Sequence, residues 1–201
     1  MVIDGIYYAL ALSAGGAAVW YLSRPAFGVP LFLLAAFYLY FFRDPDRAIP
    51  DGAVAVSPAD GKVVAVHAED AASSRISIFL NVFDVHVNRA PIAGTVTNVE
   101  YTKGQFLVAS REIASAQNER NTLTIEGAGT RVGFSQIAGL IARRIVCYKK
   151  PGDQVEKGER VGLIKFGSRV DIFLGPEWEI TVKPGQRVAG GSSILARRRQ
   201  A

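Results

Sequence analysis

Two long apolar segments at the start of the chain limit its fold more than any other feature. Residues 6–22 and 25–42 carry no charged side chain. Only Ser23 and Arg24 separate the two segments. A helix needs about 20 apolar residues to cross the hydrocarbon core of a bilayer, so each segment is slightly short. A tilted helical hairpin or a shallow re-entrant pair is therefore as plausible as two full spans. We expect residues 1–47 to form a membrane-anchoring helical hairpin.

The residues that flank these segments indicate an orientation. Tyr38 and Tyr40 lie near the end of the second segment, and Arg43 and Arg47 follow it. This order is typical of an aromatic belt at a membrane interface followed by basic anchors on the cytoplasmic side. Asp4, with no basic residue before the first segment, argues against a cleaved secretory signal. We expect a retained hairpin at the cytoplasmic face of the cell membrane. The alternative, buried helices in a soluble protein, needs an apolar cover that the remaining sequence does not offer.

The rest of the sequence changes to short β-branched runs separated by Gly, Pro, Asn and Asp. The clearest runs are residues 54–56, 61–66, 76–80, 122–125 and 170–174. Such runs at close spacing predict strands. Helical periodicity is weak, and residues 134–144 are the best and still ambiguous helix candidate. We expect residues 48–201 to form one mainly β domain, since a chain of 201 residues suits one domain with a short appendage. A doubly wound α/β fold is disfavoured.

An internal similarity supports this prediction. Residues 151–164 and residues 184–195 share a Pro-Gly pair, then Val, then Gly, then an apolar run. Each copy predicts a glycine turn, a short strand, a second glycine turn and another strand. The pattern resembles the hairpins of biotinyl- and lipoyl-type barrel-sandwich domains. The carrier function of those domains does not follow, because no lysine lies at a hairpin tip flanked by small residues or methionine.

The composition excludes several functional classes. Cys147 is the single cysteine, so no intrachain disulfide can form. Because His67 and His86 are the only histidines, we expect no zinc site and no other metal. The net charge of +5 suits an anionic partner, and the Arg197–Arg199 tail would favour anionic lipid unless it is an unstructured end. We expect no nucleic-acid partner, because the basic residues are not interleaved with an aromatic stacking platform.

Four motifs in a fixed order carry a resemblance to a known family. They are Phe41-Phe42-Arg43-Asp44-Pro45-Asp46-Arg47, Ser57-Pro58-Ala59-Asp60-Gly61-Lys62-Val63, Asp84-Val85-His86-Val87-Asn88-Arg89-Ala90-Pro91 and Phe166-Gly167-Ser168. Alone, a Gly-Ser pair is usually a turn. In this order and behind a hydrophobic anchor, the motifs resemble the phosphatidylserine decarboxylase family, in particular its short bacterial proenzymes. The similarity covers nearly the whole chain.

The resemblance implies an enzyme that makes its own cofactor. In the family, the serine of the Gly-Ser pair attacks the preceding carbonyl, and the chain is cut with formation of a pyruvoyl group. On this sequence the cut falls between Gly167 and Ser168. It gives a large chain, 1–167, and a small chain, 168–201, that form a heterodimer. Ser168 becomes the pyruvoyl cofactor, which converts phosphatidylserine to phosphatidylethanolamine without metal or nucleotide.

The resemblance also implies roles for two further side chains. His86 would deliver a proton to the substrate carbon and assist Ser168, since histidine titrates near neutrality. Asp60 would orient or polarise groups during self-cleavage. Its position in Pro58-Ala59-Asp60-Gly61, taken alone, predicts only a turn-forming aspartate. His67 matches no motif of the family.

The sequence departs from longer bacterial members at two positions. Those members carry His-x-x-His and Gly-Ser-Thr, whereas Arg89 and Arg169 stand at the second histidine and the threonine positions. Either His86 serves both steps, or self-cleavage depends on backbone strain and Asp60. Arg89 or Arg169 would hold the carboxylate or phosphate of the substrate, or would be solvated.

Two alternative functions remain open from the sequence. One is decarboxylation of a related serine lipid, such as the ether-linked archaetidylserine. The other is a non-catalytic, membrane-anchored lipoyl-like β module that binds a partner.

Overall fold

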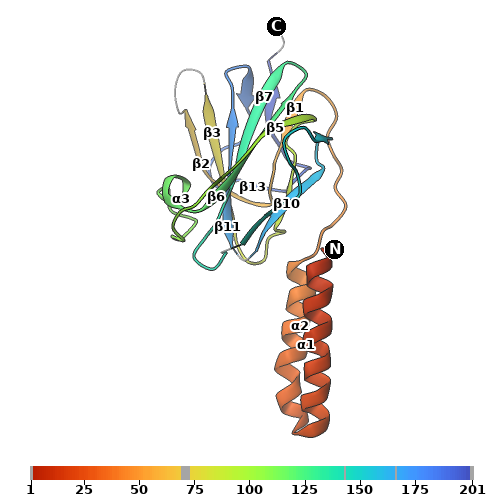
Figure 1. Ribbon diagram of the computed structural model, residues 1–201. Helices are drawn as coiled ribbons and strands as arrows, with labels where there is room; N and C mark the ends of the chain where they lie inside the picture. The colour runs from red at the N-terminus through yellow and green to blue at the C-terminus, as the bar shows by residue number, and fades with distance from the viewer. Residues whose placement is uncertain (1, 69–72, 143, 166, 200–201) are drawn as a thin grey trace. The chain divides into compact units, whose positions relative to one another are not determined.

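The chain folds into two compact units, Met1–Asp46 and Arg47–Ala201. The computed structural model describes residues 2–68, 73–142, 144–165 and 167–199 (Figure 1). The first unit is helical and the second is built mainly from strands (Figure 1).

The first unit is a pair of helices, α1 (Ile3–Leu22) and α2 (Pro25–Phe41). The helices run side by side and are joined at residues 23–24, as the sequence predicts (Figure 1). Their close approach depends on glycine, because a Cβ at Gly28 would stand 2.7 Å from the Gly16 carbonyl oxygen. At the other end of the pair, Val2 donates its backbone N–H to Phe42.

The outer surface of the helix pair is apolar. Exposed large side chains include Tyr7, Leu10, Tyr21, Leu22, Phe27 and Leu33. Helix α1 has 20 residues and is long and apolar enough to cross a membrane, whereas α2 has 17 residues. These helices meet the length requirement of a membrane hairpin only marginally, as the sequence predicts.

The second unit contains the strands and one short helix, α3 (Ala114–Gln117). The strands are β1 (Val54–Val56), β2 (Gly61–Ala68), β3 (Ser74–Leu80), β4 (Val87–Arg89), β5 (Gly94–Thr102), β6 (Arg120–Gly127), β7 (Thr130–Ile137), β8 (Arg144–Cys147), β9 (Gln154–Val155), β10 (Arg160–Lys165), β11 (Ser168–Leu174), β12 (Trp178–Ile180), β13 (Arg187–Val188) and β14 (Ile194–Arg198). The prediction of a mainly β body is confirmed.

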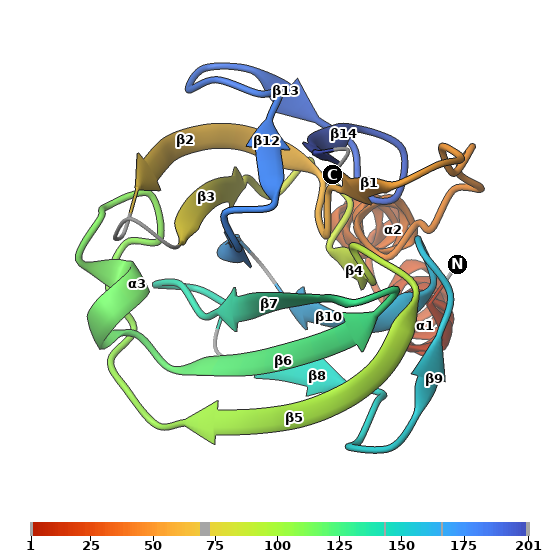
Figure 2. The same cartoon turned by 90° about the horizontal axis from the view of Figure 1, so that it is seen from above.

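An eight-stranded antiparallel sheet forms the main wall of this unit, in the order β13-β2-β3-β11-β7-β6-β5-β9. Figure 2 shows that this sheet curls, so that β2 and β5 lie on opposite sides of the interior. Two three-stranded sheets, β1-β14-β12 and β4-β10-β8, complete the barrel-sandwich-like body. The interior is filled by alternate apolar residues of the curled sheet, including Val63, Ile78, Leu123, Phe134 and Ile172.

The predicted hairpin repeat is present. Each Pro-Gly turn leads into a two-residue strand, β9 or β13, and then into a longer strand, β10 or β14. The matching glycines have matching backbone angles: φ is 95° at Gly152 and 94° at Gly185, and it is 80° at both Gly158 and Gly191. Left-handed angles of this kind favour glycine, which explains why the repeat keeps it at these places.

Some local expectations are wrong. The described residues of 134–144 form no helix: Phe134 to Ile137 end β7, and Arg144 begins β8. Cross-strand pairing of β7 with β6 and β11 outweighs the weak helical periodicity. The Arg47 guanidinium donates to Asp60, and its role as a membrane anchor stays a prediction.

The basic tail is also ordered through Arg199. Strand β14 extends to Arg198, and the Arg198 guanidinium donates to the carbonyl oxygens of Ala128 and Gly129. The tail therefore contributes to the sheet and is not an unstructured end up to that point.

Two phenylalanines test the position of the core. Phe134 is fully buried and Phe83 is 64% exposed. Phe134→Ala should cost about 3–5 kcal/mol and lower the Tm by about 10 °C, because it leaves a cavity in the core. Phe83→Ala is the matched control and should leave the Tm nearly unchanged. Thermal scans by circular dichroism in detergent measure both; equal Tm values for the two variants would contradict this core.

Candidate active site

The Gly-Ser pair lies at the start of a central strand. Ser168 is the first residue of β11, which pairs with β3 on one side and β7 on the other. Gly167 precedes the strand with φ of +70°, a left-handed angle that disfavours residues with a side chain. Phe166 of the predicted motif lies outside the described residues. The backbone therefore turns next to the bond where cleavage is predicted.

His86 contacts Gly167, the residue before this bond, through the Gly167 backbone nitrogen. Its side chain is buried, and its Nε2 accepts a hydrogen bond of 3.0 Å from the Gly167 N–H. Its Nδ1 lies 2.9 Å from the Asp84 carbonyl oxygen, which can only accept. The proton of the ring therefore sits on Nδ1, and Nε2 carries a lone pair. His86 is held in the neutral tautomer with that lone pair facing the Gly-Ser segment.

The turn before His86 fixes this tautomer, and its role was missed from the sequence. The Asp84 carboxylate accepts a hydrogen bond of 2.9 Å from the Asn81 N–H, and the Asn81 side chain accepts one of 2.8 Å from the Phe83 N–H. Arg187 forms an ion pair with Asp84. The Asn-x-x-Asp spacing is a turn signal, but the sequence does not reveal which carbonyl the turn presents.

The Ser168 hydroxyl is buried and has no hydrogen-bond partner among the described residues. A buried hydroxyl without a partner is unfavourable and calls for an explanation, which a catalytic role would supply. The structure therefore brings Gly167, Ser168 and His86 together, as three of the four predicted site residues.

Asp60, the fourth predicted residue, has well-defined partners. Its carboxylate accepts hydrogen bonds of 3.0 and 2.9 Å from Arg47 and one of 2.7 Å from the Gly190 N–H. These contacts join the segment before β2 to the hairpin that carries Gly190. They fix the carboxylate in place and leave its role in cleavage as a prediction.

The two arginines that depart from the longer family members are not solvated. Arg89 is buried and donates to the Gly158 carbonyl oxygen at 3.0 Å. Arg169 is fully buried, and its donors go to protein acceptors, including Asp171. The suggestion that Arg169 holds a substrate anion is therefore wrong, since its guanidinium is already engaged.

An apolar pocket of about 300 Å³ opens beside Gly167. Its lining includes Phe79, Val82, Val108, Leu140, Ile141 and Gly167. Gly139 packs so closely on the Gly167 carbonyl that a Cβ at residue 139 would clash with that oxygen. The reactive bond thus borders an apolar opening.

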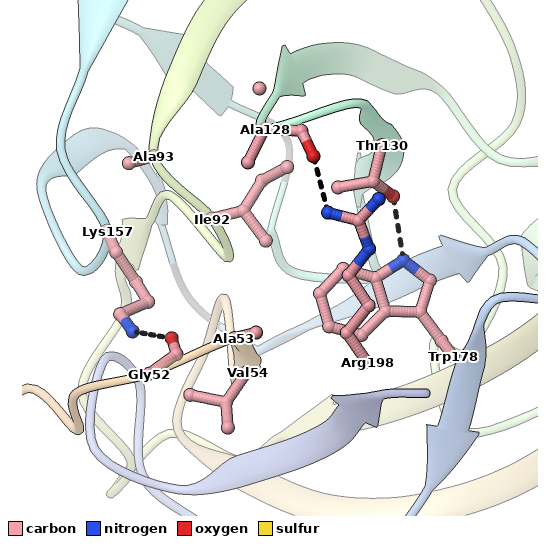
Figure 3. A pocket seen from close by; sticks show the side chains of 11 residues that line it. Gly52, Ala53, Val54, Ile92, Ala93, Ala128, Thr130, Lys157, Trp178 and Arg198 are labelled. Carbon is pink, nitrogen blue, oxygen red and sulfur yellow. Dashed lines mark hydrogen bonds between the residues drawn. The ribbon is translucent and has the colours of Figure 1, made fainter. Parts of the chain in front are cut away.

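A second pocket, of about 150 Å³, is lined by a different set of residues (Figure 3). Trp178 and Arg198 line it, and the Trp178 Nε1–H donates to Thr130 at 3.0 Å. Lys157 and Arg198 at its rim donate to backbone carbonyls of Gly52 and Ala128 (Figure 3). None of the candidate catalytic residues lines this pocket, so the Gly167 pocket is the candidate active site.

The segment between β5 and β6 contributes an acidic residue that the sequence did not single out. Glu112 accepts hydrogen bonds from Arg169, at 2.9 Å, and from Arg75. Partial burial raises the pKa of Glu112, but these two hydrogen bonds outweigh it and hold the pKa below its usual value.

This pKa shift predicts a pH-dependent stability. A carboxylate with a lowered folded-state pKa stabilises the fold above its unfolded pKa of about 4.3, and the contribution is lost as the pH falls through the folded pKa. Glu112→Gln should therefore lower the Tm at about pH 7, and the difference from wild type should close below about pH 4. The effect should be small, because Glu112 is half exposed. A difference that grows on acidification would contradict the assignment.

Comparison with known proteins places the chain in a family. The model of the phosphatidylserine decarboxylase family matches residues 34–196. A phosphatidylserine decarboxylase proenzyme of Solibacter usitatus is 68% identical over 198 residues, which cover 98% of this chain and 97% of that protein. Proteins of the same name from Desulfotalea psychrophila and Magnetococcus marinus are each 48% identical, over 82% and 83% of this chain and 81% and 80% of theirs.

The matched region begins within α2 and ends within β14, so it includes Gly167, Ser168 and His86. The similarity is high and nearly complete in both directions. The chain belongs to the phosphatidylserine decarboxylase family.

Proposed function

We propose that this protein cuts itself between Gly167 and Ser168 and then converts phosphatidylserine to phosphatidylethanolamine. One observation carries the proposal: the His86 Nε2 accepts a hydrogen bond of 3.0 Å from the Gly167 N–H, and the next residue, Ser168, has a buried hydroxyl with no partner among the described residues. The names of the relatives give the substrate and describe a proenzyme, which supports the same conclusion.

Self-cleavage follows from this arrangement. The Ser168 oxygen attacks the Gly167 carbonyl carbon, the carbon–nitrogen bond breaks, and an ester links the two residues. Loss of the Ser168 Cα proton then expels the Gly167 carboxylate, and water replaces the nitrogen, which leaves as ammonia. His86 accepts the hydroxyl proton at Nε2 in the first step. Its tautomer leaves Nε2 unprotonated, and Nε2 acts as the base once it exchanges the hydrogen bond from the Gly167 N–H for one from the Ser168 hydroxyl.

The residues present fit the group that results. Ser168 supplies its atoms, and the buried, unsatisfied oxygen of that side chain marks where it forms. The pyruvoyl group supplies a carbonyl that binds the substrate amine and takes up the electron pair left when CO₂ departs. His86 then returns a proton to the substrate carbon, since it borders the same position. Asp60 orients the site during cleavage through a carboxylate that Arg47 and Gly190 hold in place.

The two chains would stay associated after the cut. Strand β11 of the small chain lies between β3 and β7 of the large chain. Strand β13 pairs with β2, and β14 pairs with β1. These ladders and the core they share hold the 1–167 and 168–201 chains as a heterodimer without a covalent link.

A membrane location suits the substrate. A phospholipid keeps its acyl chains in the bilayer, and the helix pair exposes apolar side chains that would partition there. The Arg43 guanidinium stacks 3.9 Å from the Tyr40 ring centre at the end of α2, an arrangement that suits a headgroup layer. We infer that the hairpin anchors the enzyme at the cytoplasmic face of the cell membrane.

The direct test is conversion of phosphatidylserine in vesicles, followed by thin-layer separation of the lipid products. Wild type should form phosphatidylethanolamine, and Ser168→Ala should form none, because it lacks the atoms of the cofactor. Activity in Ser168→Ala would contradict the proposal. Vesicles of archaetidylserine, tested alongside, distinguish a head-group preference from a preference for ester-linked tails.

The two histidines give a matched pair of variants. His86→Ala should slow self-cleavage by about 10²–10⁴-fold, the usual contribution of a positioned general base. His67→Ala should cleave at the wild-type rate, because the His67 side chain is about half exposed and faces Glu112. Gel electrophoresis of freshly translated protein over time follows the cleavage. Equal rates for the two variants would remove His86 from the mechanism.

A further inference from the structure

Arg169 is the residue next to the cleavage point, and its charge is fully buried. Its Nε donates to Asp171 at 2.7 Å, and its Nη2 donates to Ser77 at 2.6 Å and to Glu112 at 2.9 Å. Burial of a guanidinium is costly unless its donors are satisfied, and here they are bound from three directions. The head group of Arg169 is therefore fixed relative to β3, β11 and the segment that carries Glu112.

Arg169 belongs to a cluster of two guanidinium groups and two carboxylates in which each group contacts the two of opposite charge. Arg75 donates to Asp171 at 3.2 Å and also binds Glu112, so that each carboxylate bridges both guanidinium groups. Two positive and two negative charges cancel, which lowers the cost of burying Arg169. We call Arg75, Glu112, Arg169 and Asp171 the latch cluster.

The latch cluster lies on the face of β11 opposite to the reactive side chain. Successive side chains of a strand point to opposite faces, so Ser168 shares its face with Val170 and Ile172, which lie in the core. Arg169 shares the other face with Asp171. The cluster cannot touch the reacting atoms from there, and it acts on residue 168 only through the backbone of Arg169.

Cleavage makes this backbone position critical. In the uncut chain, residue 168 is fixed from both sides, by Gly167 and by Arg169. After the cut, residue 168 is a chain end whose sole covalent attachment is to Arg169. A reacting group that moves by about 1 Å can lose about 10²-fold in rate, so the new end has to be restrained.

Resting on the function proposed above, we propose that Arg169 is a positioning residue: the latch cluster holds the pyruvoyl end of the small chain in its reactive place after cleavage. Glu112 is the part of the latch that belongs to the segment between β5 and β6 of the large chain. It ties that segment to the small chain across the cut. Replacement of a buried ion cluster by apolar side chains is often neutral for stability, so the function of the cluster is geometric.

The test uses full-length Arg169→Lys and Glu112→Gln in detergent, each purified after self-cleavage. Phenylhydrazine titrates the pyruvoyl group, so kcat can be given per pyruvoyl, and the rate of hydrazone formation without substrate reports how accessible residue 168 is. Arg169→Lys keeps the charge and loses the planar fork. Glu112→Gln removes one partner at a half-exposed position, which makes it a variant that folds. Glu126→Gln, which breaks the exposed ion pair with Arg131, is the control.

Both latch variants should lower kcat per pyruvoyl by about ten-fold with little change in KM, because the reacting group is misplaced while the binding pocket is intact. They should also react several-fold faster with phenylhydrazine, since the chain end opens locally more often. Glu126→Gln should behave as wild type. The double variant should be no worse than Arg169→Lys alone, because the two residues act as one unit.

Two results would overturn the latch. One is an unchanged kcat per pyruvoyl and hydrazone rate in Glu112→Gln. The other is an equal loss of kcat in Phe134→Ala, a core variant on the opposite face of the sheet from the cluster, which would trace the effect to general destabilisation. A wild-type protein without titratable pyruvoyl would instead refute the proposed function itself.

Discussion

The hydrogen-bond ladder of β11 is the constraint on which the rest of the structure depends. It fixes Ser168 between β3 and β7 at the centre of the curled sheet, while Gly167, just outside the ladder, turns away with φ of +70°. One peptide bond therefore joins a rigid residue to a turn. Because this ladder and the pairings of β13 with β2 and of β14 with β1 hold the segment after this bond, a cut there removes little of the structure. The position of the Gly-Ser pair at a strand start makes self-cleavage compatible with a stable fold.

The chemistry is concentrated in one side chain whose protonation is set by the backbone. The Asp84 carbonyl accepts a hydrogen bond from the Nδ1–H of His86, so Nε2 is unprotonated and accepts from the Gly167 N–H. A turn held by Asn81 and by the ion pair with Arg187 places that carbonyl. Arg187 lies after the Gly-Ser pair and Asp84 before it, and Arg169 and Glu112 are divided in the same way. Each side of the proposed cut is thus tied to the other through such contacts.

The sequence was sufficient for features with a local signal. Uncharged runs predicted the helix pair, β-branched runs predicted the strands, and the Pro-Gly repeat predicted two hairpins whose glycine angles agree within a degree. Gly167, Ser168 and His86 were identified through the resemblance to the family, and the fold brings them together. The features that the sequence did not predict depend on contacts between residues that are far apart in the chain. The pairing of β7 overrides the helical periodicity of residues 134–144, and Arg169 is buried because Ser77 and Glu112, far apart in the sequence, converge on it.

The central claim is that this chain cuts itself at Gly167–Ser168 and leaves a pyruvoyl group, and an intact-mass spectrum of the freshly purified wild-type protein tests it most directly. The account predicts two fragments, residues 1–167 and 168–201, with the smaller one lighter by one ammonia than a chain that begins with serine. A single mass at the 21.6 kDa of the uncut chain, from folded protein, would contradict it. That result would favour a non-catalytic β module on a membrane anchor.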